Sequence, residues 1–360
     1  MRRRILIVIL LVLLLVACQP GGFVPTVRHP AGTNPAGQLV KAEPTINATA
    51  TAAPKAVMLE PQGFIQHIHD PVIAHAGDTY YVFSTGSRIP FICSKDKVVW
   101  EFCGRIFESN PAWTREINRD LVDIWAPDIS FFNDRWHLYY AVSNFGSQNS
   151  AIGLATNVTL DLESPDYKWV DGGEVLRSHP GDQWNAIDPN LVLDENDQPW
   201  LAFGSFWGGI KLRKLERTTG KLAVTDQNLY SLASRPRTPG TPGAIEAPNI
   251  IRKQSYYYLF VSFDFCCRGK DSTYNIRVGR ARSITGPYVD REGKPMMDGG
   301  GTLVIAGGGR WAGPGHCSVL QENKIAWLIY HAYDTEWHGV ATLRIAALRW
   351  DSEGWPTISP

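Results

Sequence analysis

The chain has 360 residues, and its 35 lysines and arginines are balanced by 35 aspartates and glutamates. A protein that binds nucleic acid is expected to carry a basic surplus, so this neutral balance argues against that class of function. The 13 tryptophans suit sugar stacking, although an all-β core uses tryptophan equally well.

The first 18 residues predict export. Three arginines at positions 2–4 precede an apolar run over 5–17 that is too short to remain as a membrane-spanning helix. The run ends in Leu-Val-Ala-Cys at Cys18, which resembles the lipobox of bacterial lipoproteins, so we interpret 1–18 as a lipoprotein signal peptide. An acylated Cys18 would anchor the protein to a membrane at the cell surface or envelope. The alternative is an ordinary signal peptide with an incidental cysteine.

Residues 19–58 are rich in proline, threonine, alanine and glycine, and they show no apolar period. Such a segment cannot bury enough surface to offset the entropy of ordering it. We predict a disordered tether here. The rest of the chain, 59–360, is long enough to build one large core or two smaller ones.

Five copies of one short pattern then recur about every 60 residues, a spacing typical of a repeat architecture. In each copy a proline opens an apolar run, and a second run rich in aromatic residues follows after a turn. The aligned prolines are Pro71, Pro127, Pro189, Pro248 and Pro314. The pattern indicates two strands joined by a tight turn, with room for two more, and therefore predicts an all-β, five-bladed β-propeller. A β-sandwich would not repeat the same proline motif at five even positions.

Three copies carry an acid one or two residues before the proline, namely Asp70, Asp188 and Glu246. The innermost strands of a propeller start at one face, so these acids should meet in one pocket, where repulsion and burial move their pKa values apart. Hydrolysis of a glycosidic bond needs one protonated and one ionised carboxyl group. Asp-Pro is also a common turn, but three such acids in one channel favour catalysis. Asp128 follows its proline, which favours a structural or supporting role.

These motifs resemble those of glycoside hydrolase family 43, and most closely its endo-1,5-α-L-arabinanases. The resemblance extends from about residue 65 to beyond residue 335. It rests on the segments His69-Asp70-Pro71, Trp125-Ala126-Pro127-Asp128, Asn185-Ala186-Ile187-Asp188-Pro189-Asn190, Gly204-Ser205-Phe206-Trp207, Ile245-Glu246-Ala247-Pro248 and Cys266-Cys267-Arg268-Gly269.

The resemblance implies an inverting reaction with Asp70 as general base and Glu246 as general acid. Asp188 would tune the pKa of the acid and orient the sugar. In an inverting enzyme the two working carboxyl groups lie about 6.5–9.5 Å apart, which leaves room for a water molecule. The resemblance also implies a substrate-binding set. Its members are Trp125, Phe145, Gly146, Asn185, Ala186, Ile187, Ser205, Phe206 and Trp207. Trp125 and Phe145 are candidates for sugar stacking, and packing in the core is the alternative for both.

The segment Gly313-Pro314-Gly315-His316 resembles the one with which these arabinanases hold a metal ion, usually calcium. The resemblance implies His316 as the one protein ligand, with water molecules completing the shell. Hard cations prefer oxygen ligands, so a histidine that is only hydrogen-bonded is the alternative.

Two pairs of cysteines are close in sequence. Cys93 and Cys103 can form a hairpin disulfide in an exported protein, and Cys266 is followed directly by Cys267. We expect Cys317 to be a buried thiol, and the spacings do not suggest zinc.

The sequence therefore predicts an exported hydrolase that cleaves internal α-1,5-L-arabinofuranosyl linkages of arabinan. Two alternatives stay within the same family: an exo-acting arabinofuranosidase and a β-xylosidase, because loops decide the substrate. The segment Phe91–Trp113 can reshape one rim of the cleft, so endo versus exo action stays open. A propeller that binds glycans without cutting them is the third alternative, and the intact acids argue against it.

Overall fold

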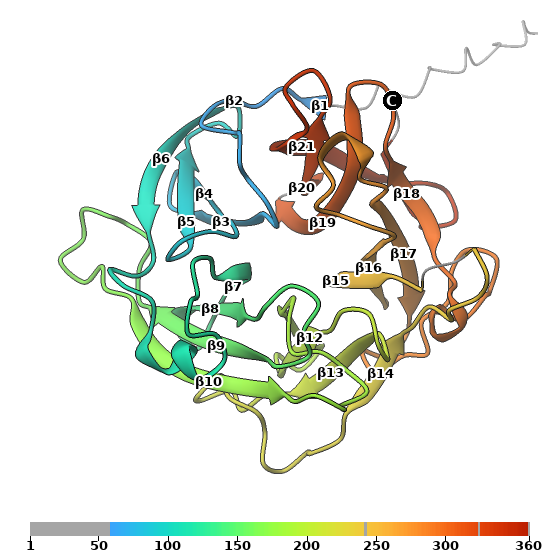
Figure 1. Ribbon diagram of the computed structural model, residues 1–360, viewed down its shortest axis with the longest axis horizontal. Helices are drawn as coiled ribbons and strands as arrows, with labels where there is room; N and C mark the ends of the chain where they lie inside the picture. Colours follow the sequence, from blue (N-terminus) through green and yellow to red (C-terminus); the bar gives the residue numbers. More distant parts are fainter. Residues whose placement is uncertain (1–57, 241–242, 323–324, 359–360) are drawn as a thin grey trace, which may run out of the picture. The chain divides into compact units, whose positions relative to one another are not determined.

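The computed structural model describes residues 58–240, 243–322 and 325–358, so the predicted signal peptide and residues 19–57 of the predicted tether lie outside the described part. The described residues form five sheets arranged as blades around a central axis, which confirms the predicted five-bladed β-propeller (Figure 1). Three short 3-10 helices connect strands, η1 (Ala112–Glu116), η2 (Gly269–Asp271) and η3 (Met296–Asp298). Within these ranges, no helix has the length and apolar character needed to cross a membrane.

The blades are built mainly from strands that follow one another in the sequence (Figure 1). The first two blades contain β3 (Val72–Ala76), β4 (Thr79–Phe83), β5 (Pro90–Ser94) and β6 (Val99–Arg105) with β2 (Gln62–Gly63), then β7 (Trp125–Phe132), β8 (Arg135–Val142), β9 (Ser150–Asn157) and β10 (Val170–Ser178). The third and fourth contain β11 (Asn190–Leu193), β12 (Pro199–Phe203), β13 (Ile210–Lys214) and β14 (Tyr230–Ala233), then β15 (Ile245–Lys253), β16 (Tyr256–Phe263), β17 (Asn275–Ala281) and β18 (Thr302–Ala306). The fifth contains β19 (Trp311–Glu322), β20 (Ile325–Asp334) and β21 (Val340–Trp350), with β1 (Met58–Leu59) and β22 (Pro356–Thr357) on β21. The innermost strands are β3, β7, β11, β15 and β19, and in each blade the strands that follow lie successively further out, while β2 and β1 join the outer edges of the first and fifth blades (Figure 1).

The ring is closed by the first strand of the described chain. β1 pairs antiparallel with β21, and Met58 lies opposite Ala346. The strand thus includes Met58, the last residue of the predicted tether. A backbone hydrogen bond of 2.9 Å from Leu343 to Ile65 adds to this closure. The fifth blade therefore takes its outer strand from the beginning of the domain, and this pairing resists opening of the ring.

The core consists of five clusters of buried apolar side chains, one between each pair of neighbouring blades. Both faces of a blade are covered, so the inner strands are continuous apolar runs rather than alternating ones. In β8, for example, the run from Leu138 to Val142 is fully buried. The cluster between the fifth and first blades joins Ile329 and Ile345 to Ile73 and Val82, so hydrophobic burial also closes the ring.

A residue with positive φ marks the same point in all five copies. These residues are Asp70, Ala126, Asp188, Ala247 and His316. In β7, β15 and β19 the register with the next strand shifts at this point, which makes it a β-bulge. A proline follows in four copies, either within the bulge or directly before the strand begins, where its missing N–H is not needed for the ladder.

The fifth copy differs from the predicted alignment. Cys317, and not Pro314, follows the positive-φ residue His316 and takes the place of the proline. The alignment on Pro314 was therefore wrong by three residues, because the bulge rather than the proline defines the equivalent position. Glu246 also lies one residue before the positive-φ residue of its copy, Ala247, whereas Asp70 and Asp188 are themselves the positive-φ residues of theirs.

Polar side chains two residues after the positive-φ residue form hydrogen bonds with the next blade. Asp128 accepts hydrogen bonds of 2.9 Å from the Asn190 amide and 2.8 Å from the backbone N–H of Leu191. Asn190 in turn accepts one of 2.7 Å from the backbone of Ile250. The structural role expected for Asp128 is thus that of a clamp between the second and third blades.

Replacement of Asp128 by alanine is expected to lower the free energy of unfolding by about 1–3 kcal/mol, because two buried donors lose their acceptor. Urea unfolding followed by tryptophan fluorescence measures this loss. Asp166→Ala, at an exposed position, is the matched control and should leave stability nearly unchanged. Equal stability of the two variants would contradict the clamp.

Four of the five described cysteines form disulfides. A disulfide joins Cys93 in β5 to Cys103 in β6, and a second joins Cys266 to Cys267. Cys317 is a buried free thiol, as expected.

Candidate active site

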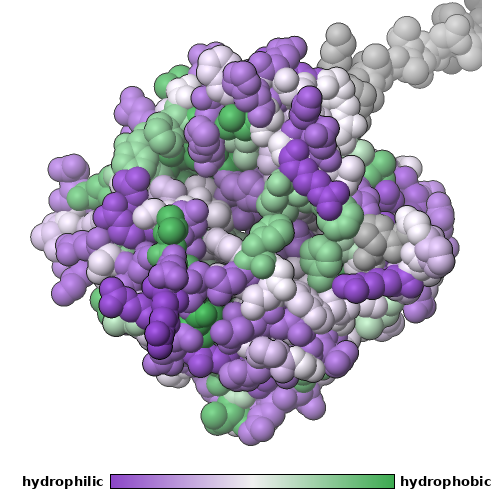
Figure 2. All heavy atoms as spheres, in the orientation of Figure 1, coloured by the Kyte–Doolittle hydropathy of each residue, from purple (hydrophilic) through white to green (hydrophobic). Residues whose placement is uncertain are grey.

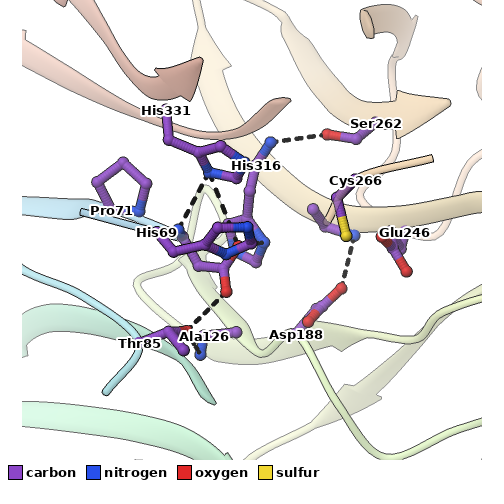
Figure 3. Close-up of polar contacts among 12 residues, drawn as sticks. His69, Pro71, Thr85, Ala126, Asp188, Glu246, Ser262, Cys266, His316 and His331 are labelled. Carbon is purple, nitrogen blue, oxygen red and sulfur yellow. Dashed lines mark hydrogen bonds and ion pairs between the residues drawn. The ribbon is translucent and has the colours of Figure 1, made fainter. Parts of the chain in front are cut away.

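The three predicted acids and His316 meet where the innermost strands begin (Figure 3). Asp70 and Asp188 come shortly before β3 and β11, Glu246 lies in β15, and His316 lies in β19. Asp70 and Asp188 have positive φ, and the register of β15 and β19 shifts beside Glu246 and His316. All three acids are buried near the axis. Figure 2 shows the centre of this face, where apolar side chains lie beside polar ones.

Asp70 is surrounded by donors. Its Oδ1 lies 2.8 Å from Nδ1 of His69 and 3.1 Å from Nδ1 of His316, and its Oδ2 accepts a bond of 2.6 Å from the Thr85 hydroxyl. Burial raises the pKa of Asp70, but the charges and hydrogen bonds of His69 and His316 outweigh it and hold this pKa well below the usual range. Asp70 is therefore an ionised carboxylate, the state that a general base needs.

A chain of hydrogen bonds stands behind His69. The backbone N–H of Cys267 donates to the Tyr333 hydroxyl at 2.7 Å, and that hydroxyl lies 2.8 Å from Nε2 of His69. This contact helps to fix the His69 ring with Nδ1 facing Asp70. The Cys266–Cys267 loop thereby helps to orient the Asp70 carboxylate through Tyr333 and His69.

His331 completes the shell around Asp70. Its Nδ1 accepts the backbone N–H of Asp70 at 3.1 Å, and its ring stacks on His69 with 4.0 Å between centroids. Burial and the charge of His69 hold the pKa of His331 well below its usual range, so the ring is neutral.

Glu246 and Asp188 have the opposite tendency. Burial raises the pKa of Glu246, partly offset by hydroxyl hydrogen bonds from Ser205 at 2.6 Å and from Tyr274. Burial also raises the pKa of Asp188 to about 8, and the nearby negative charges of Glu246 and Asp70 act in the same direction. Asp188 accepts the backbone N–H of Ala247 at 3.0 Å. Near neutral pH this pair holds a proton that Asp70 does not, which separates a candidate acid from a candidate base.

Replacement of Ser205 by alanine is expected to move the alkaline limb of the pH–kcat/KM profile to higher pH. The serine hydroxyl stabilises the ionised form of Glu246, so its loss raises the pKa of Glu246 and keeps the acid protonated further into the alkaline range. Initial rates across the pH range measure this shift. A limb that stays in place, or moves to lower pH, would show that Glu246 does not control it.

His316 is the candidate metal ligand. Burial lowers its pKa, but the carboxylates of Asp70, Asp188 and Glu246 outweigh burial and raise this pKa to about 9. The pocket thus stabilises a positive charge at this point. Nδ1 faces Asp70, while no described residue hydrogen-bonds to Nε2, so a cation can bind that nitrogen by displacing its proton and take over the positive charge. The residues present therefore fit one imidazole ligand among water molecules.

Two other groups of potential ligand atoms fit a metal less well. His69, Asp70 and His331 have ligand atoms within 4.8 Å of one another, but Nδ1 of His331 already accepts an N–H. In the second group, His69 with Cys266 and Cys267, the sulfurs are joined in a disulfide and offer no thiolate.

The predicted substrate-binding residues divide into an exposed and a buried group. Phe145 is 83% exposed, which excludes core packing, and Trp207 is 41% exposed. Gly146 follows Phe145 in the same loop, and Trp125 is half-buried at the start of β7. In the buried group, the side chains of Asn185, Ala186, Ile187 and Ser205 are all buried next to the acids in sequence or in contact with them. The backbone N–H of Phe206 donates to the carbonyl of Ile245, the residue before Glu246. The exposed aromatic residues can stack on sugar rings.

Several residues of the site were not predicted. Thr85 could have been found, because it lies two residues after β4, as Ser205 lies two residues after β12, and both hydroxyls donate to an acid. The contacts of Tyr274 and Tyr333 carry no comparable signal in the sequence.

Comparison with known proteins gives consistent results. The family model described as glycosyl hydrolases family 43 matches residues 64–356. An extracellular exo-α-(1→5)-L-arabinofuranosidase of Cellvibrio japonicus is 44% identical, with 81% of this chain and 86% of the relative covered. An extracellular endo-α-(1→5)-L-arabinanase of Bacillus subtilis is 42% identical over 81% of this chain and 87% of its own length. The structure of a family 43 endo-arabinanase from Bacillus licheniformis is similar with a TM-score of 0.77 and 49% identity, covering 83% of this chain and 99% of that one.

Proposed function

The chain belongs to family 43 of the glycosyl hydrolases and is a glycosidase, and we propose that it cleaves internal α-1,5-L-arabinofuranosyl linkages of arabinan with inversion. The observation that carries this proposal is that the acids at one end of the central channel differ in their protonation states. Hydrogen-bond donors surround Asp70, while burial favours the protonated forms of Glu246 and Asp188. Relatives named as acting on α-(1→5)-linked arabinofuranosyl units support the substrate.

In the proposed reaction Asp70 removes a proton from water, and the water oxygen attacks the anomeric carbon. Glu246 gives its proton to the glycosidic oxygen as the bond to the leaving sugar breaks. The base ends protonated and the acid ionised, and exchange of one proton with solvent restores both. Asp188 would tune this acid, because burial and the nearby negative charges raise the pKa values of both Asp188 and Glu246, and the two carboxyl groups then share the proton that Glu246 donates.

Product analysis of the full-length protein on debranched linear arabinan tests the proposal, with xylan and a nitrophenyl arabinoside in parallel. A ladder of arabino-oligosaccharides from the first minutes is the expected result. Activity only on xylan would overturn the substrate, and binding without release from any substrate would support a glycan-binding propeller instead.

An exo-acting arabinofuranosidase is the second candidate, because the relative from Cellvibrio japonicus, at 44% identity, carries that name. The same experiment separates the two. An exo-acting enzyme releases a single short product from the chain end, and the mean polymer length falls slowly. An endo-acting enzyme lowers the viscosity of the polymer before much reducing sugar appears.

We further propose that His316 binds calcium through Nε2, with water completing the coordination shell. A bound calcium ion would supply a fixed positive charge beside the three carboxylates. Treatment with a chelator is expected to lower both the melting temperature and the activity, and calcium should restore both. His316→Ala should lose the calcium-dependent part of the melting shift. A wild-type melting temperature that is insensitive to chelator and to calcium would contradict this site.

Export is supported by the relatives, whose names describe extracellular enzymes. We propose that Cys18 carries a lipid anchor. Expression of the full chain in a bacterial host tests this: Cys18→Ala should move the protein from the membrane fraction to a soluble one. An unchanged membrane fraction would exclude lipidation as the cause of retention.

A further inference from the structure

A second depression, of about 500 Å³, lies on the third and fourth blades. It is lined in part by Gln183, Trp207, Lys211, Arg235 and Arg237, and none of the residues that line it is acidic. The loop between β12 and β13 connects it to the active site, because Ser205 in this loop donates to Glu246 and Trp207 lies two residues further on. The depression therefore adjoins the loop that contacts Glu246.

Lys211 is a buried cation without a carboxylate partner. Only 7% of the residue is exposed, and its Nζ donates to the Gly208 carbonyl at 2.8 Å and to the Ser231 hydroxyl at 2.9 Å. Both acceptors are neutral, and no described acid forms an ion pair with this ammonium group. An ammonium group has three hydrogens, so one donor remains for a ligand. Burial alone lowers the pKa of Lys211, and an anion would offset that effect.

Two arginines add to the positive charge of the depression. Arg235 uses Nη1 to bind Asp264 at 2.6 Å and the Ala244 carbonyl at 3.1 Å. Arg237 is exposed and forms no ion pair with any described residue. Three cations are therefore balanced by one carboxylate, so the depression attracts anions.

The chemistry of a ligand follows from this combination. The buried ammonium group and the arginines match a carboxylate, and the half-exposed ring of Trp207 beside them matches the C–H face of a sugar. A neutral sugar would leave the charge of Lys211 uncompensated, and a small inorganic anion would leave Trp207 uncovered. We propose that the depression binds a uronate, a sugar that carries a carboxylate, within an acidic polysaccharide.

This inference concerns binding and does not depend on cleavage of arabinan by Asp70 and Glu246. A carboxylated unit held here would lie next to the loop that contacts Glu246, so the proposed enzyme would accept acidic sugars near the cleaved bond. Acceptance of acidic sugars near the cleaved bond rests on the proposed function, whereas the binding experiment tests the site without it.

Calorimetric titration of the full-length protein with a trigalacturonate tests the proposal, with arabinotriose and inorganic phosphate as parallel ligands. We expect saturable binding of the uronide that weakens with added salt, and much weaker binding of phosphate. Lys211→Met should weaken uronide binding about tenfold or more, and Arg237→Gln, on an exposed loop, should weaken it as well. Lys214→Met, on the same strand but outside the depression, removes the same charge and should leave binding unchanged.

The outcomes separate this proposal from the function of the catalytic site. Uronide binding that depends on Lys211, in a protein that does not cleave arabinan, keeps the subsite and rejects the arabinanase. Cleavage of arabinan without any uronide binding keeps the arabinanase and rejects the subsite. Phosphate binding as tight as uronide binding, or equal affinities in Lys211→Met and Lys214→Met, would overturn the subsite.

Discussion

Glu246→Gln is expected to lower the rate of arabinan hydrolysis by about 10²–10⁴-fold, the contribution typical of a positioned general acid. The amide is close in size to the carboxyl group and can still meet the hydroxyls of Ser205 and Tyr274, so the fold should not change. Hydrolysis of a nitrophenyl arabinoside should suffer much less, because a nitrophenolate leaves without a proton. Initial rates on the two substrates measure this difference.

Glu163→Gln, at an exposed position between β9 and β10, is the matched control and should retain full activity on both substrates. If Glu246→Gln lost activity equally on arabinan and on the activated arabinoside, Glu246 would not be the residue that protonates the leaving oxygen.

The sequence was sufficient for the fold and for the acids, because four prolines each follow a positive-φ residue at or just before an innermost strand. Proline is tolerated at such a point because no ladder hydrogen bond needs its N–H, and Asp70 and Asp188 are themselves the positive-φ residues there. The fifth copy shows the limit of this signal. Cys317 occupies the proline position, so the nearest proline gave an alignment that the backbone does not follow.

The residues that surround the acids could not be predicted in the same way. His69 contacts Tyr333 across 264 positions of sequence, because the ring closure brings the first and fifth blades together. A repeat pattern describes what all blades have in common. These contacts instead join residues that occupy different positions in two different blades. The same holds for Lys211, whose unusual feature is the absence of an acidic partner among the described residues, and no motif encodes that.

The acids and their surroundings form one electrostatic arrangement. His69, His316 and the Thr85 hydroxyl stabilise the ionised form of Asp70, and that charge is among the causes that raise the pKa of Asp188. Lowering one pKa therefore helps to raise another, so the two protonation states needed for inversion support each other.

Asp70→Asn should test the other half of this arrangement, with an expected loss of about 10²–10⁴-fold. In contrast to Glu246→Gln, the loss should be as large on the nitrophenyl arabinoside as on arabinan, because water must be activated whatever group leaves. Asp78→Asn, in the exposed turn between β3 and β4, provides the matched control. Nuclear magnetic resonance of the first product formed by the wild type should show the inverted anomer. A retained anomer would mean that a carboxylate attacks the sugar directly, and Asp70 would then be a nucleophile rather than a base.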